Sequence, residues 1–571
     1  MKKTFNIYKT VVVLAAVIST MLMTSCKDFL TIIPPDKIVH ENFWQTKDEV
    51  NGMLATSYLK LLSGDAVSKA IVWGELRADN MLNRPNASKD IKYIVEANLL
   101  DENQYSKWGV FYEAINNANL VIEYADSVVE RDPDFTEEEL AIVKGEMYAM
   151  RALCHFYLVR TFRDIPLALQ AAIEDSRLPE YRQVHPMVAL DSIMVDLDRA
   201  EKLVNKSGDF PSHASNFGRI TENAVLAMKA DVNLWRAAFA TYYEGDSLYT
   251  PTATVQYYYD ECIENCRSVI SKMDAMFQKN NQGKPIKNDY PYHLIKNEGE
   301  VEVLETSKVS TAYNTIFGTM NSSESIFELQ VEGDNVKNGF CNGIYRIYGY
   351  EGNNGEVIVP NSFLANYETD DLRRYSFTNT PIETNTGDKQ TDVVIAKYTA
   401  SASPAKEYRK TNQFDANWIV YRKTDVMLML AEALVAQPNP TAGDVKEAFD
   451  FVNVINKRSR IDTTSIKNPL SESNYVDPKA CLDLVLKERA LELSFEGKRW
   501  YDLVRKALRE KSTNGIIFVA DKLTSNSNVV KSKMSTINGL FFPIYIDELR
   551  YNKLLKQNEA YDKDKSTKEM N

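Results

Sequence analysis

The chain has 571 residues, of which 44% are hydrophobic and 26% are charged, and this ordinary globular composition excludes a disordered or fibrous protein. Its formal net charge of -12 has the wrong sign for binding the phosphates of a nucleic acid, so the sequence predicts no nucleic-acid partner. The 31 tyrosines suit ligand contact as well as core packing, because each apolar ring carries a hydroxyl group.

Residues 1–25 have the pattern of an export signal. Lysines near the start precede an apolar run from Val11 to Met23, which is short for a membrane span. Two small residues then stand just before Cys26, as in a lipoprotein signal, where the cysteine is acylated and becomes the new N-terminus. The sequence therefore predicts a lipid anchor at Cys26, and an ordinary secretory signal is the alternative.

Most of the remaining chain reads as amphipathic helices, because apolar residues recur every three to four positions. Their pairing is similar to tetratricopeptide repeats, although the period is irregular. We therefore predict a mainly α fold with four degenerate helix-pair units. The expected helices cover residues 108–122, 143–158, 186–204, 221–240, 255–273, 425–436 and 442–458.

The cysteines and histidines indicate no cofactor. Cys262 and Cys266 lie four residues apart on one face of an expected helix, but no second pair of metal ligands is close in sequence. We expect buried or adventitiously paired thiols there. The five histidines form no metal-binding or catalytic motif, so the sequence predicts no cofactor and no metal site. No calcium-loop spacing occurs, but acidic side chains are plentiful, and the sequence leaves calcium binding open.

Three glutamates, Glu488, Glu492 and Glu496, recur every four residues on one helical face. Paired carboxylates could perform glycosidic chemistry. Several arginines are within reach, however, and a structural ion-pair network is the more natural interpretation.

Several motifs resemble one known family. They are Cys26–Leu30, Phe162–Leu167, Trp418–Ala433, Glu488–Arg505, and Phe542–Ile544 followed by Glu548, Asn552, Gln557 and Asn558. Together they strongly resemble the SusD/RagB family of outer-membrane nutrient-uptake lipoproteins, along essentially the whole mature chain. The resemblance implies a single α-rich globule, with a part at 26–240 that carries helix pairs and a SusD/RagB part at 241–571. One side would hold four tetratricopeptide-like units, and the other an irregular ligand-binding face.

The expected ligand loops lie in the stretch 313–361, which is rich in glycine and asparagine and contains one expected strand, 326–331. Sugars need exposed aromatic rings beside amides and carboxylates. The candidates in this stretch are Tyr345, Tyr348, Tyr350, Asn353, Asn354 and Glu356. The alternative is that these tyrosines cover the core. The family resemblance adds the segment with Asn80, Asn83, Tyr93 and Asn98, whose counterpart contributes to the same face.

The resemblance implies a non-catalytic protein that captures oligosaccharide or a related nutrient. Its partner would be a SusC-like TonB-dependent β-barrel transporter, and it would sit on the exterior of the outer membrane, held by the lipid at Cys26. Two alternatives stay open: a surface glycoside hydrolase that uses Glu492 or Glu496, and a helical-repeat scaffold without a small ligand. The motifs do not specify the ligand, which could also be a peptide.

Overall fold

The chain folds mainly into α-helices, as the sequence predicts. The computed structural model describes residues 43–173, 181–246, 249, 251–284, 289–297, 300–303, 307–331, 344–345, 355–379, 393–398, 416–460 and 466–562. The predicted signal (1–25) and the predicted anchor Cys26 lie outside these residues. Within them, every helix is too short or too polar to cross a membrane.

The long helices pack in series, each lying against the next one along the chain. Their bounds are α3 Lys47–Leu62, α6 Gly109–Tyr124, α8 Glu137–Phe162, α9 Pro186–Leu203, α11 Glu222–Tyr242, α12 Val255–Asn280, α17 Lys423–Ala436 and α18 Ala442–Arg458. Helix α19 (Pro478–Glu492) packs on α17 and α18, and α20 (Arg499–Arg509) packs on α11. All seven helices expected from apolar spacing are present. The tetratricopeptide-like character of the series stays a prediction.

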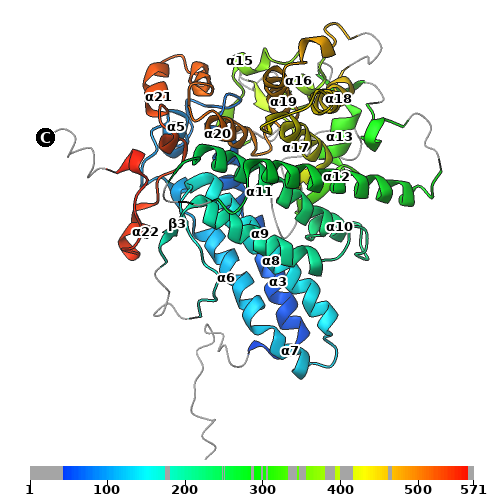
Figure 1. Ribbon diagram of the computed structural model, residues 1–571, viewed down its shortest axis with the longest axis vertical. Helices are drawn as coiled ribbons and strands as arrows, with labels where there is room; N and C mark the ends of the chain where they lie inside the picture. The colour runs from blue at the N-terminus through cyan, green and yellow to red at the C-terminus, as the bar shows by residue number, and fades with distance from the viewer. Residues whose placement is uncertain are drawn as a thin grey trace, which may run out of the picture.

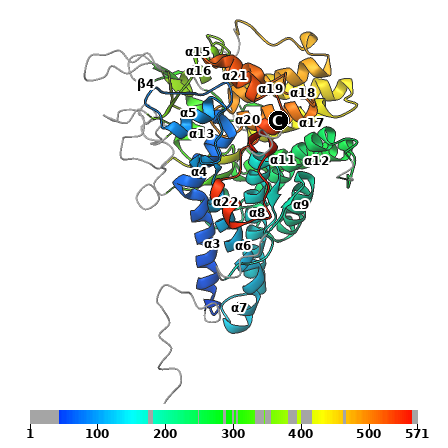
Figure 2. The same ribbon diagram turned by 90° about the vertical axis from the view of Figure 1, so that its left-hand side faces the viewer.

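Shorter helices connect this series. They are α4 Gly64–Ile71, α5 Lys89–Val95, α7 Asp126–Arg131, α10 Ser215–Gly218, α13 Thr311–Gly318, α15 Asn361–Leu364, α16 Arg373–Ser376, α21 Ser527–Lys533 and α22 Ile546–Tyr551. Segments of other helical type are η2 Val72–Leu76, η3 Gln104–Ser106, η5 Pro291–His293, η6 Glu472–Asn474, η7 Ile517–Lys522, η8 Ile537–Leu540 and η9 Glu559–Tyr561. Figures 1 and 2 show α3, α6 and α8 extending toward a tip at α7, whereas α5, α15 and α19 lie toward the other end of the molecule.

Helix α8 illustrates how local sequence sets the helix ends. The side chain of Thr136 accepts a hydrogen bond from the backbone N–H of Glu139 (3.2 Å), and the Glu139 carboxylate accepts one from the N–H of Thr136 (3.1 Å). This reciprocal pair satisfies two N–H groups that the helix leaves without partners. The helix ends at Arg163, whose φ is 67°, and Pro166 follows closely.

The described strands form five antiparallel two-stranded ribbons. The pairs are β1 Leu82–Asn83 with β7 Val357–Ile358, β2 Ile165–Pro166 with β3 Gln183–Val184, β4 Glu300–Val303 with β5 Ser307–Ser310, β6 Ser325–Leu329 with β10 Trp418–Arg422, and β8 Thr378–Asn379 with β9 Val394–Ile395. Strand β6 confirms the one expected strand. The sequence did not predict β10, because a short buried run that leads directly into a helix has no strand periodicity.

The core contains the aromatic residues expected there. Trp108 is 3% exposed and Tyr501 is 1% exposed, and Tyr112 and Tyr157 are partly buried against the same core cluster. On α12, Cys262 and its neighbour four residues on are buried, unpaired thiols, and burial raises the pKa of Cys262 well above its usual value. Of the two expectations for this pair, buried thiols are therefore confirmed.

Candidate ligand-binding face

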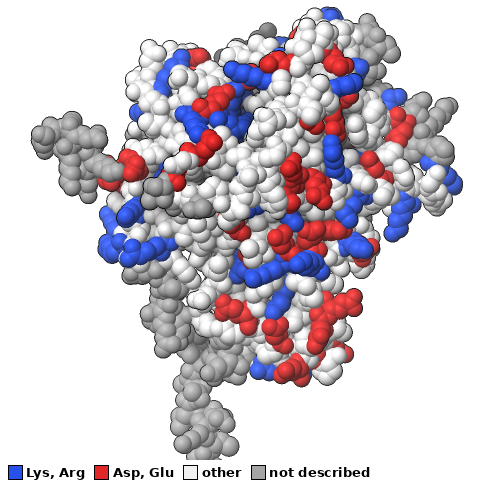
Figure 3. Space-filling model, viewed as in Figure 1, with Lys and Arg blue, Asp and Glu red and all other residues white. Residues whose placement is uncertain are grey.

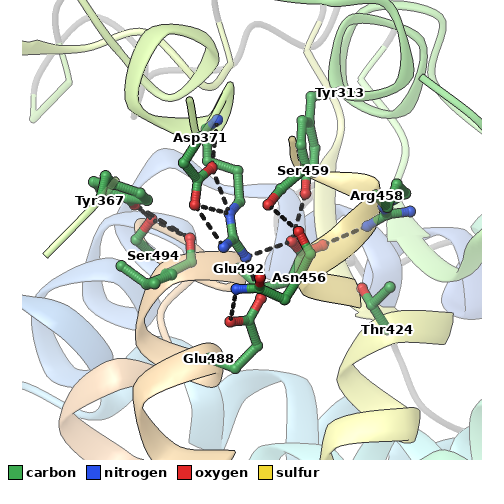
Figure 4. A network of polar contacts seen from close by, with 12 residues as sticks. Tyr313, Tyr367, Asp371, Thr424, Asn456, Arg458, Ser459, Glu488, Glu492 and Ser494 are labelled. Atoms are coloured by element: carbon green, nitrogen blue, oxygen red, sulfur yellow. Dashed lines mark hydrogen bonds and ion pairs between the residues drawn. The ribbon is translucent and has the colours of Figure 1, made fainter. Parts of the chain in front are cut away.

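The glutamates at positions 488, 492 and 496 lie inside a buried ion-pair network. Figure 4 shows the part of it around Glu488 and Glu492. We define the buried network as Glu488, Glu492 and Glu496 together with Arg373, Lys397, Arg422 and Arg458. Arg373 bridges Glu488 (2.6 Å) and Glu492 (3.2 Å), and Arg422 bridges Glu492 (2.8 Å) and Glu496 (2.8 Å). The structural interpretation of the glutamate row is therefore confirmed.

Glu492 stands at the centre of this network and has no exposed surface. Its carboxylate accepts hydrogen bonds from Arg458 (2.6 Å) and from the hydroxyl of Tyr313 (2.7 Å), in addition to the two arginine contacts above. Burial alone would raise the pKa of Glu492, but the surrounding guanidinium groups outweigh it and hold the pKa well below its usual range. Burial would likewise raise the pKa of Glu496, but the charges of Arg422 and Lys397 outweigh it and lower the pKa.

These two carboxylates do not fit the hydrolase alternative. A glycosidic general acid needs a raised pKa and access to the substrate. Glu492 and Glu496 have lowered pKa values, are 0% and 3% exposed, and already bind cations from several parts of the chain.

The β1–β7 ribbon joins the two segments that the sequence predicted to share a ligand face. Leu82 pairs with Ile358 and Asn83 with Val357. One residue further, the backbone N–H of Arg84 donates to the carbonyl of Glu356 (2.8 Å). Segments almost 300 positions apart in the printed sequence therefore lie side by side.

Glu356 strengthens this junction through its side chain. Its carboxylate accepts hydrogen bonds from the backbone N–H (2.8 Å) and the hydroxyl (2.6 Å) of Ser88. Ser88 is the N-cap of α5, so Glu356 adds a negative charge where the helix dipole favours one. Glu356 is half-buried, and its first role is to fix α5 against β7.

Helix α5 and the turn before it supply the accessible groups. The Tyr93 ring is half-buried, and Lys89 Nζ lies 5.1 Å from its centroid. Asn86 is exposed on the turn, and the Asn83 side chain is partly exposed and donates to the carbonyl of Arg84 (3.2 Å). We define the ligand face as Asn83, Asn86, α5 with Tyr93, and Glu356. An aromatic ring beside amides and a carboxylate is the set of groups that a saccharide requires.

Tyr345 does not lie on this face as an exposed ring. It is 2% exposed, its hydroxyl donates to the carbonyl of Phe495 (3.0 Å), and its ring stacks on Tyr398 with centroids 6.2 Å apart. The expectation of an exposed Tyr345 is therefore corrected. The alternative, that the ring covers the core, describes its position, because the hydroxyl finds a partner inside the protein.

Asn80 is likewise an interior residue. It has no exposed surface, and its side-chain nitrogen donates to the carboxylate of Glu75 (2.5 Å). Glu75 also accepts from the backbone N–H of Gly497 (3.2 Å) and, at 3.4 Å, from that of Lys498, where α20 begins. Asn80 therefore supports a buried carboxylate, which corrects its prediction as a ligand-contacting residue.

Four predicted ligand residues and the anchor lie outside the described residues. They are Tyr348, Tyr350, Asn353, Asn354 and Cys26. The sequence did not predict a role for Asn86 or Ser88. The signal for Ser88 was available, since a serine before a short apolar-periodic segment is a typical N-cap.

Comparison with known proteins identifies the family. Residues 265–561 match the family described as the SusD family, and residues 28–234 match one described as "Starch-binding associating with outer membrane". Because the first match spans more than half of the chain, the chain belongs to the SusD/RagB family. This confirms the family that the sequence motifs predicted, and the second description assigns starch binding and outer-membrane association to family members.

Individual relatives agree. SusD-like protein P38 of Formosa agariphila is 27% identical over 580 residues, covering 98% of this chain and 100% of the relative. A SusD-like protein of Bacteroides ovatus is 22% identical, covering 85% of this chain and 80% of the relative. A solved SusD superfamily protein from Bacteroides vulgatus superimposes with a TM-score of 0.66 at 20% identity, covering 91% of this chain and all of that one. The structure of B. fragilis NanU superimposes with a TM-score of 0.62 at 20% identity, covering 93% of this chain and 100% of NanU. The fold is therefore that of the SusD superfamily.

Proposed function

We propose that this protein is a cell-surface lipoprotein that binds a glycan or related nutrient and delivers it to a SusC-like TonB-dependent outer-membrane transporter. The family description supports glycan binding at the outer membrane. The lipid at Cys26 would hold the protein there, facing the exterior. The ligand would be an oligosaccharide, captured without chemical change.

The observation that carries this proposal is the β1–β7 ribbon. It brings Tyr93 and Asn86 to the same place as Glu356, so that groups suited to sugar binding converge from two distant segments. A saccharide would lay its C–H face on the Tyr93 ring and hydrogen-bond its hydroxyl groups to the neighbouring amides. Tyr348, Tyr350, Asn353 and Asn354 belong to the segment 346–354, which ends next to Gly355 and β7, and we propose that they extend this face.

Calorimetric titration of the full-length protein in detergent with a panel of oligosaccharides tests the proposal. Replacement of Tyr93 by alanine should weaken binding about tenfold, because one sugar–ring contact is lost. Tyr551→Ala is the matched control, since Tyr551 is 84% exposed on α22, outside the ligand face. A panel without any ligand, or equal effects of the two variants, would contradict glycan binding at this face and favour the scaffold alternative.

Delivery to a transporter needs its own test. Chemical cross-linking in native outer membranes should join the protein to a β-barrel transporter. The cross-linked product should disappear when either protein is absent. The cross-linked partner would be identified by mass spectrometry. Cross-links to periplasmic or inner-membrane proteins alone would contradict both the location and the partner.

A further inference from the structure

A cleft of about 470 Å³ opens between α15, α19, α20 and η7, and we call it the α19 cleft. Its volume lies within the range of small-molecule sites. Figure 1 shows α15, α19 and α20 at the end of the molecule away from the tip at α7. Part of the cleft wall is close in sequence to the ligand face. Asp79 lies a few residues before β1, and Ser362 lies a few residues after β7.

Several side chains in the α19 cleft are exposed and available to a ligand. The ring of Phe518 is 42% exposed, although a large apolar side chain gains stability when it is covered. Ser362 and Asn366 are exposed, and neither side chain has a hydrogen-bond partner within the described part of the chain. The cleft therefore offers an aromatic surface, a hydroxyl group and an amide.

The charges in the cleft leave a positive surplus. Each lining carboxylate has a cationic partner: the pairs are Asp79–Arg499, Asp483–Lys506 and Asp521–Lys531. Lys487 lines the cleft, is exposed, and forms no ion pair with any described residue. Lys522 is buried and donates to the carbonyls of Leu76 (3.1 Å) and Ala78, and burial lowers its pKa to about 7, so it adds no dependable positive charge to the cleft. An exposed ammonium group at Lys487, beside carboxylates that already have cationic partners, favours a negatively charged ligand.

A larger cleft of about 930 Å³, beside the β2–β3 ribbon, is a weaker candidate. Its amides already hold the backbone. Gln557 accepts from the N–H of Ile544 (2.8 Å) and donates to the carbonyl of the same residue (2.9 Å), and Asn558 donates to the carbonyl of Asn538 (2.9 Å). These side chains fix the C-terminal segment, so few of them remain to bind a ligand.

We propose that the α19 cleft is a subsite for a saccharide unit that carries a carboxylate group. The sugar ring lies on Phe518, its hydroxyl groups bond to Ser362 and Asn366, and its carboxylate pairs with Lys487. This inference rests on the proposed function and deepens it, because it names an acidic saccharide as the ligand class. A chain of several sugar units would reach from the ligand face into the cleft.

Titration of the full-length protein in detergent with trigalacturonate and with uncharged maltotriose tests the inference. At low salt, Lys487→Ala should weaken trigalacturonate binding about fivefold and leave maltotriose binding unchanged, because only the acidic sugar loses an ion pair. Lys479→Ala is the matched control, since Lys479 is an exposed lysine on the same helix that does not line the cleft. Phe518→Ala should weaken trigalacturonate binding by about fivefold to tenfold.

The outcomes separate this inference from the proposed function. One outcome would contradict the subsite and keep the ligand face. In it, Tyr93→Ala weakens oligosaccharide binding, but trigalacturonate binds no more tightly than maltotriose, and Lys487→Ala has the same affinity as Lys479→Ala. If trigalacturonate binding depends on Lys487 and Phe518 but not on Tyr93, the subsite stands and the ligand face is wrong. Failure of both sugars to bind overturns the subsite.

Discussion

The buried network and the ligand face use similar polar groups in opposite ways. Each carboxylate oxygen of Glu488, Glu492 and Glu496 has a partner, and the cationic partners come from α16, β10, α18 and the loop near β9. At the ligand face, one carboxylate oxygen of Glu356 accepts hydrogen bonds at the cap of α5, whereas Asn86 is exposed and the Tyr93 ring is half-buried. In this chain, side chains whose charges are paired inside the protein hold the fold together, whereas polar groups at the surface remain available to a ligand.

The charges at the surface are arranged differently from those in the buried network. Figure 3 shows positive and negative side chains interspersed on one face, without a broad area of a single sign. Figure 4 shows a charge cluster inside the protein, where Asp371, two residues before α16 begins, shares the cation Arg373 with Glu488 and Glu492 of α19. On the face shown, a ligand would therefore meet local sets of groups rather than a broad area of one charge.

Among the variants, we expect the largest loss of stability at the centre of the buried network. Glu492→Ala should lower the free energy of unfolding by about 3–5 kcal/mol, because it leaves buried guanidinium groups without a counter-charge. Chemical denaturation measures this loss, and Glu492→Gln, which keeps the shape, provides a folded variant with a smaller loss. Asp450→Ala removes an exposed pair with Lys446 (2.7 Å) and should leave stability unchanged. Equal stabilities of the two alanine variants would refute the structural role of Glu492.

Tyr345 should behave as part of the core rather than as part of the ligand face. Tyr345→Ala should cost about 3–5 kcal/mol of unfolding free energy, as for other large buried aromatic rings. Tyr345→Phe loses only the hydrogen bond to Phe495 and should cost about 1 kcal/mol. Thermal unfolding of the two variants checks these values. An alanine variant that keeps its melting temperature but loses ligand would return Tyr345 to the ligand face.

Glu75 gives the buried region a dependence on pH. Burial raises the pKa of Glu75 to about 7, above its ordinary value of 4.5, so the folded state holds this proton more tightly than the unfolded state. The contribution of Glu75 to stability is therefore greatest below pH 4.5 and is lost as the pH rises to about 7. The loss amounts to about 3 kcal/mol.

The variant Glu75→Gln should abolish that part of the pH dependence. Its amide can still accept from the N–H of Gly497, and Asn80 Oδ1, which has no partner within the described residues, can accept the new donor after an amide flip. Denaturation curves between pH 4.5 and 8 should converge at low pH and separate at high pH, with the variant the more stable. Parallel curves for the two proteins would show that Glu75 does not titrate in this range.

The smallest effect is expected where the ligand face is anchored. Ser88→Ala removes the cap of α5 and the hydroxyl contact with Glu356, and should cost about 1 kcal/mol. Because α5 carries Tyr93, hydrogen exchange should accelerate in α5 while the core helices stay protected. Uniform acceleration over the chain would mean that the cap supports the whole fold.

Sequence reasoning predicted the helices and the nature of the glutamate row, because both follow from local periodicity. Glu488 and Glu492 share a face of α19, but the helix ends at Glu492, so the predicted helical face does not extend to Glu496. The partners Arg373 and Arg458 come from other elements, and only the fold brings them close. Long-range pairing of this kind is invisible to a reading of neighbouring residues.

The candidate site shows the same limit. Tyr345 stands among glycines and asparagines, which indicated a surface loop, yet its hydroxyl reaches the carbonyl of Phe495, 150 positions further along the chain. Asn80 was misplaced for a different reason: its partner Glu75 sits in a π-helical turn, η2, that sequence spacing does not predict. The two segments of the face were expected together from family resemblance, and the β1–β7 ribbon explains physically why they meet.

The most direct test of the division between network and face measures two properties of the same two variants. Oligosaccharide titration and chemical denaturation would be run on Tyr93→Ala and Glu492→Gln beside the unchanged protein. We predict that Tyr93→Ala loses about tenfold in binding with unchanged stability, whereas Glu492→Gln loses stability and binds normally under native conditions. Loss of binding in the folded Glu492 variant, together with normal binding by the Tyr93 variant, would contradict the account.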